Sequence, residues 1–202
     1  DDAADFAKKR SVQDEVPFIS PYDDWDIIAG QGTVGKEILE DLTDPIHAIF
    51  VPVGGGGLIA GVAAWVKSVC PNVKVIGVEP DSSNCLQTAL KNKGPVRLDD
   101  VDIFADGVAV KEIGGRPFEV CKQWVDEVIC VGSDDICAAT KDIFEESRSV
   151  PEPSGALVLA GIKAYAQRTG IRDANMVAVV SGGNLDFGKL EYVAQRATFL
   201  EG

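Results

Sequence analysis

The chain has 202 residues, enough for one large domain or a domain with part of a second, and such a chain buries about 70% of its unfolded surface. Its formal net charge of −13 argues against a nucleic-acid partner, because binding to a phosphate backbone requires a basic surface. No apolar run reaches membrane-spanning length, and the first ten residues lack the character of a signal or transit peptide. We therefore expect neither a nucleic-acid nor a membrane partner.

The predicted elements alternate between helices and strands. Residues 1–10 are typical of the end of a helix, 16–20 of a short extended segment and 21–26 of a turn. The remaining helices are predicted at 30–42, 58–69, 83–92, 117–125, 133–148 and 153–169, and the strands at 46–53, 73–80, 127–131 and 176–181. Short apolar strands separated by helices indicate an α/β fold, a parallel sheet flanked by helices.

The chain contains five cysteines, at positions 70, 85, 121, 130 and 137. Their number is odd and they show no C-x-x-C pairing, which favours a reducing compartment over a disulfide framework. We expect them to be small buried apolar residues.

Two glycine-rich loops follow predicted strands. Gly54 to Gly57 come after the strand at 46–53, and Ser181-Gly182-Gly183-Asn184 come after the strand that ends at Val180. Four glycines in a row are unfavourable, at roughly 0.5–1 kcal/mol each relative to alanine, unless the backbone must approach a ligand. Ligands of open parallel sheets bind at the carboxyl ends of the strands, and a helix start offers unpaired N–H groups. The first loop therefore predicts a phosphate site.

A dinucleotide site is one alternative. Residues 55–60 match G-x-G-x-x-A, and Glu79 lies at the end of the next predicted strand, where a ribose-binding acid would stand. Such a protein would be an oxidoreductase. The other interpretation of Glu79 is a solvated carboxylate at a strand end. A dinucleotide site, however, has no use for the loop at 181–184.

Five motifs in order carry a resemblance to a known family. They are P-V-G-G-G-G-L-I-A-G (52–61), V-I-G-V-E-P (75–80), A-D-G-V-A-V (105–110), E-P-S-G-A (152–156) and S-G-G-N (181–184), preceded by P-Y-D-D (21–24) and G-Q-G-T (30–33). Over essentially its whole length the chain resembles the fold-type II pyridoxal-phosphate enzymes, and among them the biosynthetic threonine dehydratases, or threonine deaminases. The resemblance implies pyridoxal 5'-phosphate as cofactor and conversion of L-threonine to 2-oxobutanoate and ammonia, the first step of isoleucine biosynthesis.

The resemblance also assigns residues and domains. It implies that Gly54, Gly55, Gly56, Gly57 and Leu58 hold the cofactor phosphate, and that the hydroxyl of Ser181 meets the pyridine nitrogen. A neutral hydroxyl does not keep that nitrogen protonated, which suits β-elimination. From the residues alone, Ser181 is equally a helix N-cap. Residues 1–20 would end the small domain that covers the cofactor, and 21–202 would be the carboxyl-terminal portion of the large catalytic domain.

Glu152 and the A-D-G segment match pocket-lining regions of the family. The run Pro151-Glu152-Pro153-Ser154 is also typical of a helix start, so both interpretations stay open.

Two motifs of the family are missing. The Schiff-base lysine of the family lies in S-F-K-x-R-G-A and an asparagine beside the cofactor in S-S-G-N-H-A-Q-G, and neither sequence occurs here. We expect a fragment without a catalytic residue of its own and without the regulatory domain, inactive alone, from a homo-oligomeric protein. Its location would be the plastid stroma in a plant or alga, otherwise the cytoplasm or mitochondrion. A non-catalytic binding module is a further alternative.

No metal site is expected. Relatives that racemise serine bind a divalent metal at positions that correspond here to Glu79, Ser83 and Cys85, and a cysteine replaces the hard carboxylate ligand. A serine racemase, like a related serine/threonine dehydratase, thus remains only an alternative. The lone His47 lies in a predicted strand without a partner to make it a base. The acidic run 99–102 is interpreted as a solvated loop.

Overall fold

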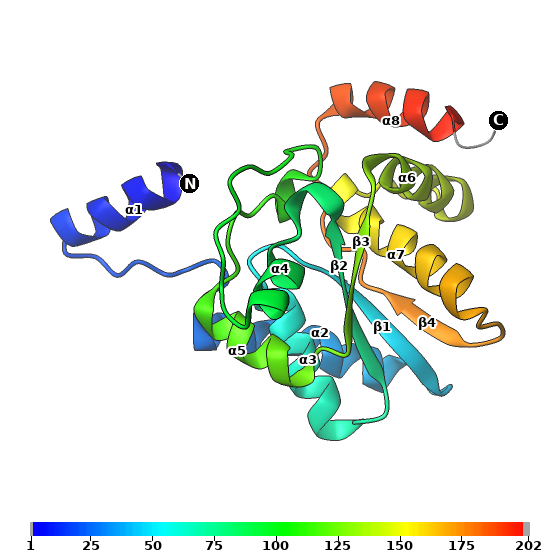
Figure 1. Cartoon of the computed structure of the whole chain (residues 1–202), viewed down its shortest axis with the longest axis horizontal. Coiled ribbons are helices and arrows are strands. Elements are labelled where there is room, and N and C mark those ends of the chain that lie inside the picture. The colour runs from blue at the N-terminus through cyan, green and yellow to red at the C-terminus, as the bar shows by residue number, and fades with distance from the viewer. Residues whose placement is uncertain (1, 200–202) are drawn as a thin grey trace.

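The computed structural model describes residues 2–199, which form a four-stranded parallel sheet with helices on both faces (Figure 1). The strands lie in the order β3-β2-β1-β4, with bounds β1 Ile46–Pro52, β2 Lys74–Pro80, β3 Glu127–Val131 and β4 Asn175–Ala178. Each neighbouring pair is parallel, with Phe50 of β1 opposite Ile76 of β2. The predicted α/β class with a parallel sheet is confirmed.

The helices form one layer on each face of the sheet. Their bounds are α1 Asp2–Gln13, α2 Trp25–Asp41, α3 Gly57–Val69, α4 Cys85–Asn92, α5 Gly115–Trp124, α6 Ser133–Ser147, α7 Pro153–Thr169 and α8 Phe187–Phe199. Helices α2 to α5 cover one face and α6 and α7 the other, with α8 packed on α6 (Figure 1). Helix α1 lies apart from the sheet, at the end of an extended segment. No helix among residues 2–199 is long and apolar enough to cross a membrane.

Strand β1 contributes side chains to two hydrophobic cores, because successive side chains of a strand point to opposite faces of the sheet. Ile49 and Val51 pack with α3, whereas Ala48 and Phe50 pack with α6 and α7, and all four are fully buried. A strand buried on both faces reads as a continuous apolar run, which is why its pattern was clear in the sequence.

Helices α2 and α3 cross at a very short distance. A Cβ atom added to Gly61 of α3 would lie 2.2 Å from the carbonyl oxygen of Ile28 in α2. The two backbones touch because both helices have glycine at the crossing, where Gly32 of α2 faces Gly61. This contact fixes α3, whose first residue is Gly57, against the body of the protein.

The structure corrects the start of α2 and the end of β4, and it adds one helix that was not predicted. Helix α2 begins at Trp25 rather than residue 30, because the Asp24 carboxylate accepts N–H bonds from Asp26 and Ile27 and so caps the helix. Strand β4 ends at Ala178 rather than 181, which leaves Ser181 in a loop. Helix α8 was not predicted; its side chains at Val193 and Ala197 pack against Cys137 of α6.

Candidate functional site

The loop Gly54–Gly57, called the glycine loop below, leads from β1 into the start of α3. All four residues are buried, and Gly56 has φ +90°, a left-handed conformation that favours glycine. Among the described residues, no hydrogen bond involves the N–H groups of Gly56, Gly57 and Leu58. Unpaired N–H groups at a helix start, together with the partial positive charge there, make an anion-binding cradle.

Neighbouring segments hold the glycine loop in place. The carbonyl oxygen of Gly55 accepts a hydrogen bond from the N–H of Gly114 at 3.1 Å, and that of Gly54 accepts one from the Cys85 thiol at 3.2 Å. The ring of Tyr22 lies over Gly55, where a Cβ atom would come within 2.2 Å of Cγ of Tyr22. These contacts hold the glycine loop in its conformation without a ligand.

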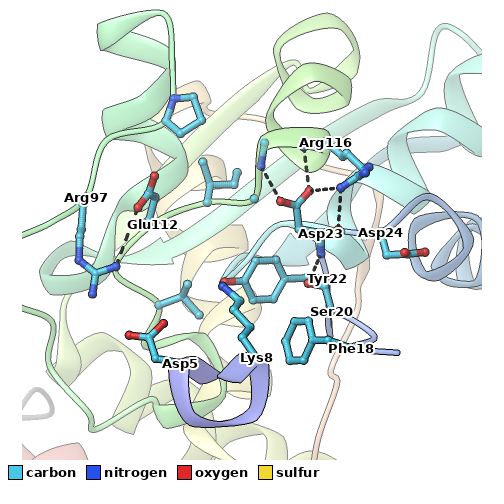
Figure 2. Close-up of a pocket in the computed structure, with 15 residues that line it drawn as sticks. Asp5, Lys8, Phe18, Ser20, Tyr22, Asp23, Asp24, Arg97, Glu112 and Arg116 are labelled. Atoms are coloured by element: carbon cyan, nitrogen blue, oxygen red, sulfur yellow. Dashed lines mark hydrogen bonds and ion pairs between the residues drawn. The ribbon is translucent and has the colours of Figure 1, made fainter. Parts of the chain in front are cut away.

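Asp23 fixes the position of the adjacent Tyr22. Its two carboxylate oxygens accept the N–H groups of Gly115, at 3.2 Å, and Arg116, at 2.9 Å, so the side chain caps α5. Figure 2 shows the Asp23 carboxylate facing this helix start and the Arg116 side chain. The motif P-Y-D-D thus joins three segments: Tyr22 covers the glycine loop, Asp23 caps α5 and Asp24 caps α2.

Ser181 lies in the second loop, residues 181–184, which follows β4 and rests on the start of α7. The N–H of Asn184 donates to Oε2 of Glu152 at 3.1 Å, and the N–H of Glu152 donates to the carbonyl of Gly182 at 3.4 Å. Glu152 is the residue immediately before α7. The prediction of Ser181 as an N-cap is wrong, because α8 begins only at Phe187.

One cavity of about 420 Å³ joins the two loops. The glycine loop and Leu58 line it together with Ser181, Tyr22 and the start of α7. Ser154, on the first turn of α7, is 3% exposed, and its hydroxyl is without a hydrogen-bond partner among residues 2–199. A buried hydroxyl is unfavourable unless it is bonded, so its position on the cavity wall indicates a place for a polar ligand atom. No lysine is among the described residues that line this cavity.

Glu79 lies behind the glycine loop and is fully buried. Its oxygens accept the N–H groups of Leu86, at 2.7 Å, and Gln87, at 2.9 Å, in the first turn of α4. Burial raises the pKa of this carboxyl to about 7, because the loss of hydration outweighs the two hydrogen bonds. Both interpretations of Glu79, as a ribose-binding acid and as a solvated carboxylate, are therefore wrong.

The positions compared with a metal site are also occupied by protein contacts. Sγ of Cys85 lies 3.6 Å from Oε1 of Glu79 in addition to its bond to Gly54. Among the residues that the structure describes, no group of three His, Cys, Asp or Glu side chains has the arrangement of a metal site. The acidic run 99–102 is mostly exposed, as predicted for a solvated loop.

His47 and the glycine loop lie at opposite ends of β1. His47 is near the start of β1, where its Nε2 is 3.0 Å from the hydroxyl of Tyr165. The five cysteines are free thiols, three of them buried. Neither His47 nor a cysteine is among the described residues that line the 420 Å³ cavity, although the Cys85 thiol bonds to the carbonyl of Gly54.

A larger cavity of about 600 Å³ lies between α1 and the start of α5 (Figure 2). Tyr22 lines both cavities. The charged side chains of the larger cavity include the ion pairs Arg97–Glu112 and Arg116–Asp23. Lys8 also lines it, but the four carboxylates of Asp5, Asp23, Asp24 and Glu112 outnumber the three cations, which makes the larger cavity a weaker anion site than the glycine loop.

Comparisons with known proteins identify the family of the chain. The family model described as pyridoxal-phosphate dependent enzyme matches residues 1–182. Threonine dehydratase 1 biosynthetic, chloroplastic, from Solanum lycopersicum is 52% identical over 98% of this chain and 32% of its own length. The L-threonine dehydratase biosynthetic IlvA of Burkholderia multivorans is 50% identical over 95% of this chain and 38% of its own length.

A solved structure gives the same result. The processed form of threonine deaminase isoform 2 from Solanum lycopersicum superimposes with a TM-score of 0.91 at 46% identity, covering 94% of this chain and 55% of that one. The chain thus spans about a third of the length of the curated relatives it matches. With a family model matching most of its length and its fold shared with a member's structure, the chain belongs to the pyridoxal-phosphate dependent enzyme family.

Proposed function

We propose that the chain is part of a threonine dehydratase and that its 420 Å³ cavity holds pyridoxal 5'-phosphate. The observation that carries the proposal is the meeting of the glycine loop and Ser181 in one cavity. The residues present fit the cofactor: unpaired N–H groups at a helix start suit its phosphate, and the buried, unpartnered hydroxyl of Ser154 leaves a polar position on the wall. The similarity to threonine dehydratases supports the substrate.

Each loop has its own task in this proposal. The N–H groups of Gly54 to Leu58 would hold the phosphate, and the Ser181 hydroxyl would meet the pyridine nitrogen. When bound, the cofactor supplies an electron sink for the charge that develops at the α-carbon of the amino acid. Because Ser181 is neutral, it moderates that sink, which favours loss of the β-hydroxyl of L-threonine over transamination.

The whole protein would convert L-threonine to 2-oxobutanoate and ammonia. The reaction also needs the lysine of the S-F-K-x-R-G-A motif, which the 202 residues do not contain. We propose further that residues 1–20 belong to a small domain and 21–202 to a large one, that the protein is a homo-oligomer, and that it works in a plastid, the cytoplasm or a mitochondrion. The cysteine at position 85, where a racemase would place a carboxylate, favours a dehydratase that needs no divalent metal.

The phosphate site is tested by titrating the chain with pyridoxal 5'-phosphate and following cofactor fluorescence. The variant Gly56→Ala adds a Cβ atom at φ +90°, 2.9 Å from Ile113, and deforms the cradle. Gly170→Ala is the matched control, because Gly170 also has positive φ but has open space around it at the end of α7. We expect Gly56→Ala to lower affinity at least tenfold, about 1.4 kcal/mol, and Gly170→Ala to leave it unchanged. Equal affinities of all three proteins would contradict the proposed site.

A further inference from the structure

The carboxylate of Glu152 is held by the loop that carries Ser181. Glu152 precedes α7, yet its side chain does not cap its own helix. Instead Oε2 accepts the N–H of Asn184 at 3.1 Å, across 32 positions of sequence. Among the described residues, the Glu152 carboxylate forms no ion pair with a lysine or arginine, so its hydrogen bond from the N–H of Asn184 is the polar contact that holds it.

Glycines surround this carboxylate on two sides. Gly182 has φ +89°, and a Cβ atom there would lie 2.4 Å from Cδ of Glu152. On the other side, a Cβ atom at Gly107 would lie 2.8 Å from Oε1. Only a residue without a side chain allows the loop to close around the carboxylate at this distance.

The first turn of α7 touches the same loop at a further point. A Cβ atom on Gly155 would lie 2.4 Å from the carbonyl oxygen of Ser181. The backbone of Ser181 is therefore placed by α7, and the remainder of the loop by Glu152. In contrast, residues 182–184 are exposed.

We propose that Glu152 is a positioning residue: by binding the N–H of Asn184 it fixes the loop 181–184 and thereby sets the position of the Ser181 hydroxyl in the cavity. The structural part stands on the contacts above, and only the consequence for cofactor binding rests on the proposed function. Glu152 also lines the cavity together with Ser181, whereas the glycine loop is held by other residues, so we expect the effect of Glu152 at the pyridine end of the ligand and not at the phosphate end.

Amide hydrogen exchange in the ligand-free chain tests the structural part. Glu152→Ala removes the acceptor, and Glu152→Gln keeps the shape but weakens the bond, so the second variant remains informative if the first folds poorly. We expect the amide of Asn184 to exchange about tenfold faster in Glu152→Ala and about threefold faster in Glu152→Gln. The control is Glu146→Gln, an exposed carboxylate on α6, which should change nothing. Unchanged exchange at Asn184 in both Glu152 variants would overturn the proposal.

Binding measurements with two probes separate this inference from the proposed function. In Glu152→Gln, affinity for pyridoxal 5'-phosphate should fall about threefold and its absorption spectrum should shift, whereas affinity for inorganic phosphate should stay as in the parent chain. An equal loss for both probes would overturn the positioning role. Failure of the parent chain to bind either probe would contradict the proposed function, while the exchange result at Asn184 would still decide the role of Glu152.

Discussion

The glycine loop and the loop 181–184 line the same cavity but are held in different ways. The glycine loop is buried, and its carbonyl groups are bound by Gly114 and Cys85 from separate elements. In the second loop, residues 182–184 are exposed, and the carboxylate of Glu152 supplies the main contact. The glycine loop is thus the more firmly held of the two, and under the proposed function its phosphate site and the ring site at the second loop should respond separately to substitution.

The largest effect should come from the support behind the glycine loop. Gly61→Ala places a Cβ atom 2.2 Å from the backbone of α2, which cannot move away without separating α2 from α3. We expect the free energy of unfolding in urea to fall by about 3 kcal/mol. Gly30→Ala, also helical but with open space around it, should stabilise the protein by about 0.5–1 kcal/mol. Equal effects of the two substitutions would contradict the close crossing of α2 and α3.

The buried Glu79, which lies behind the glycine loop, should make the free energy of unfolding depend on pH. Its pKa is about 7 in the folded protein, above its ordinary value of 4.5, so the folded state binds this proton more tightly. Stability from this group is complete below pH 4.5 and is lost as pH rises through 7, at up to about 1.4 kcal/mol per pH unit. Glu79→Gln removes this dependence. Urea unfolding of both proteins from pH 4 to pH 8 measures the difference, and parallel curves would rule out the raised pKa.

A smaller effect is expected where α7 meets the second loop. Gly155→Ala introduces a Cβ atom 2.4 Å from the Ser181 carbonyl, but the exposed loop can shift, so we expect a loss of only about 1–2 kcal/mol. Affinity for pyridoxal 5'-phosphate should fall while affinity for inorganic phosphate persists. Gly183→Ala lies in the same loop without a neighbour within 4 Å and serves as the control. Loss of phosphate binding in Gly155→Ala would show that the loops are not independent.

The smallest effect concerns the thiol that bonds to the glycine loop. Cys85→Ala removes the hydrogen bond to Gly54 and should cost about 1 kcal/mol, whereas Cys85→Ser keeps a donor there and should cost less. Amide exchange at Gly54–Leu58 should rise more in the alanine variant than in the serine variant. The reverse order would mean that the thiol contributes packing alone.

The sequence predicted the sheet and most of the helices because both depend on local patterns. The apolar run 46–53 and the glycine loop showed a buried strand leading to a ligand site. The sequence did not show that Asp23 caps α5 or that Glu152 binds Asn184, because the first contact joins residues 92 positions apart and the second joins residues 32 positions apart. Gly155 appeared as part of a helix start, and only the fold reveals that Ser181 rests on it.

Glu79 shows the same limit in another way. A glutamate that ends a strand is usually solvated, and the pattern of residues 75–80 gives no sign that α4 will fold back over it. Its burial depends on the first turn of α4, which supplies the two N–H groups that it accepts. Helix α8 was missed although Leu190, Val193 and Ala197 recur at helical spacing, and the structure buries Val193 and Ala197 with Cys137 of α6.

A crystal structure of the chain with pyridoxal 5'-phosphate tests the central claim most directly. The account predicts the phosphate within hydrogen-bond distance of the N–H groups of Gly56, Gly57 and Leu58, and the pyridine nitrogen at the hydroxyl of Ser181. Density for the phosphate in the 600 Å³ cavity beside Lys8 and Arg116, with the glycine loop left without it, would contradict the account.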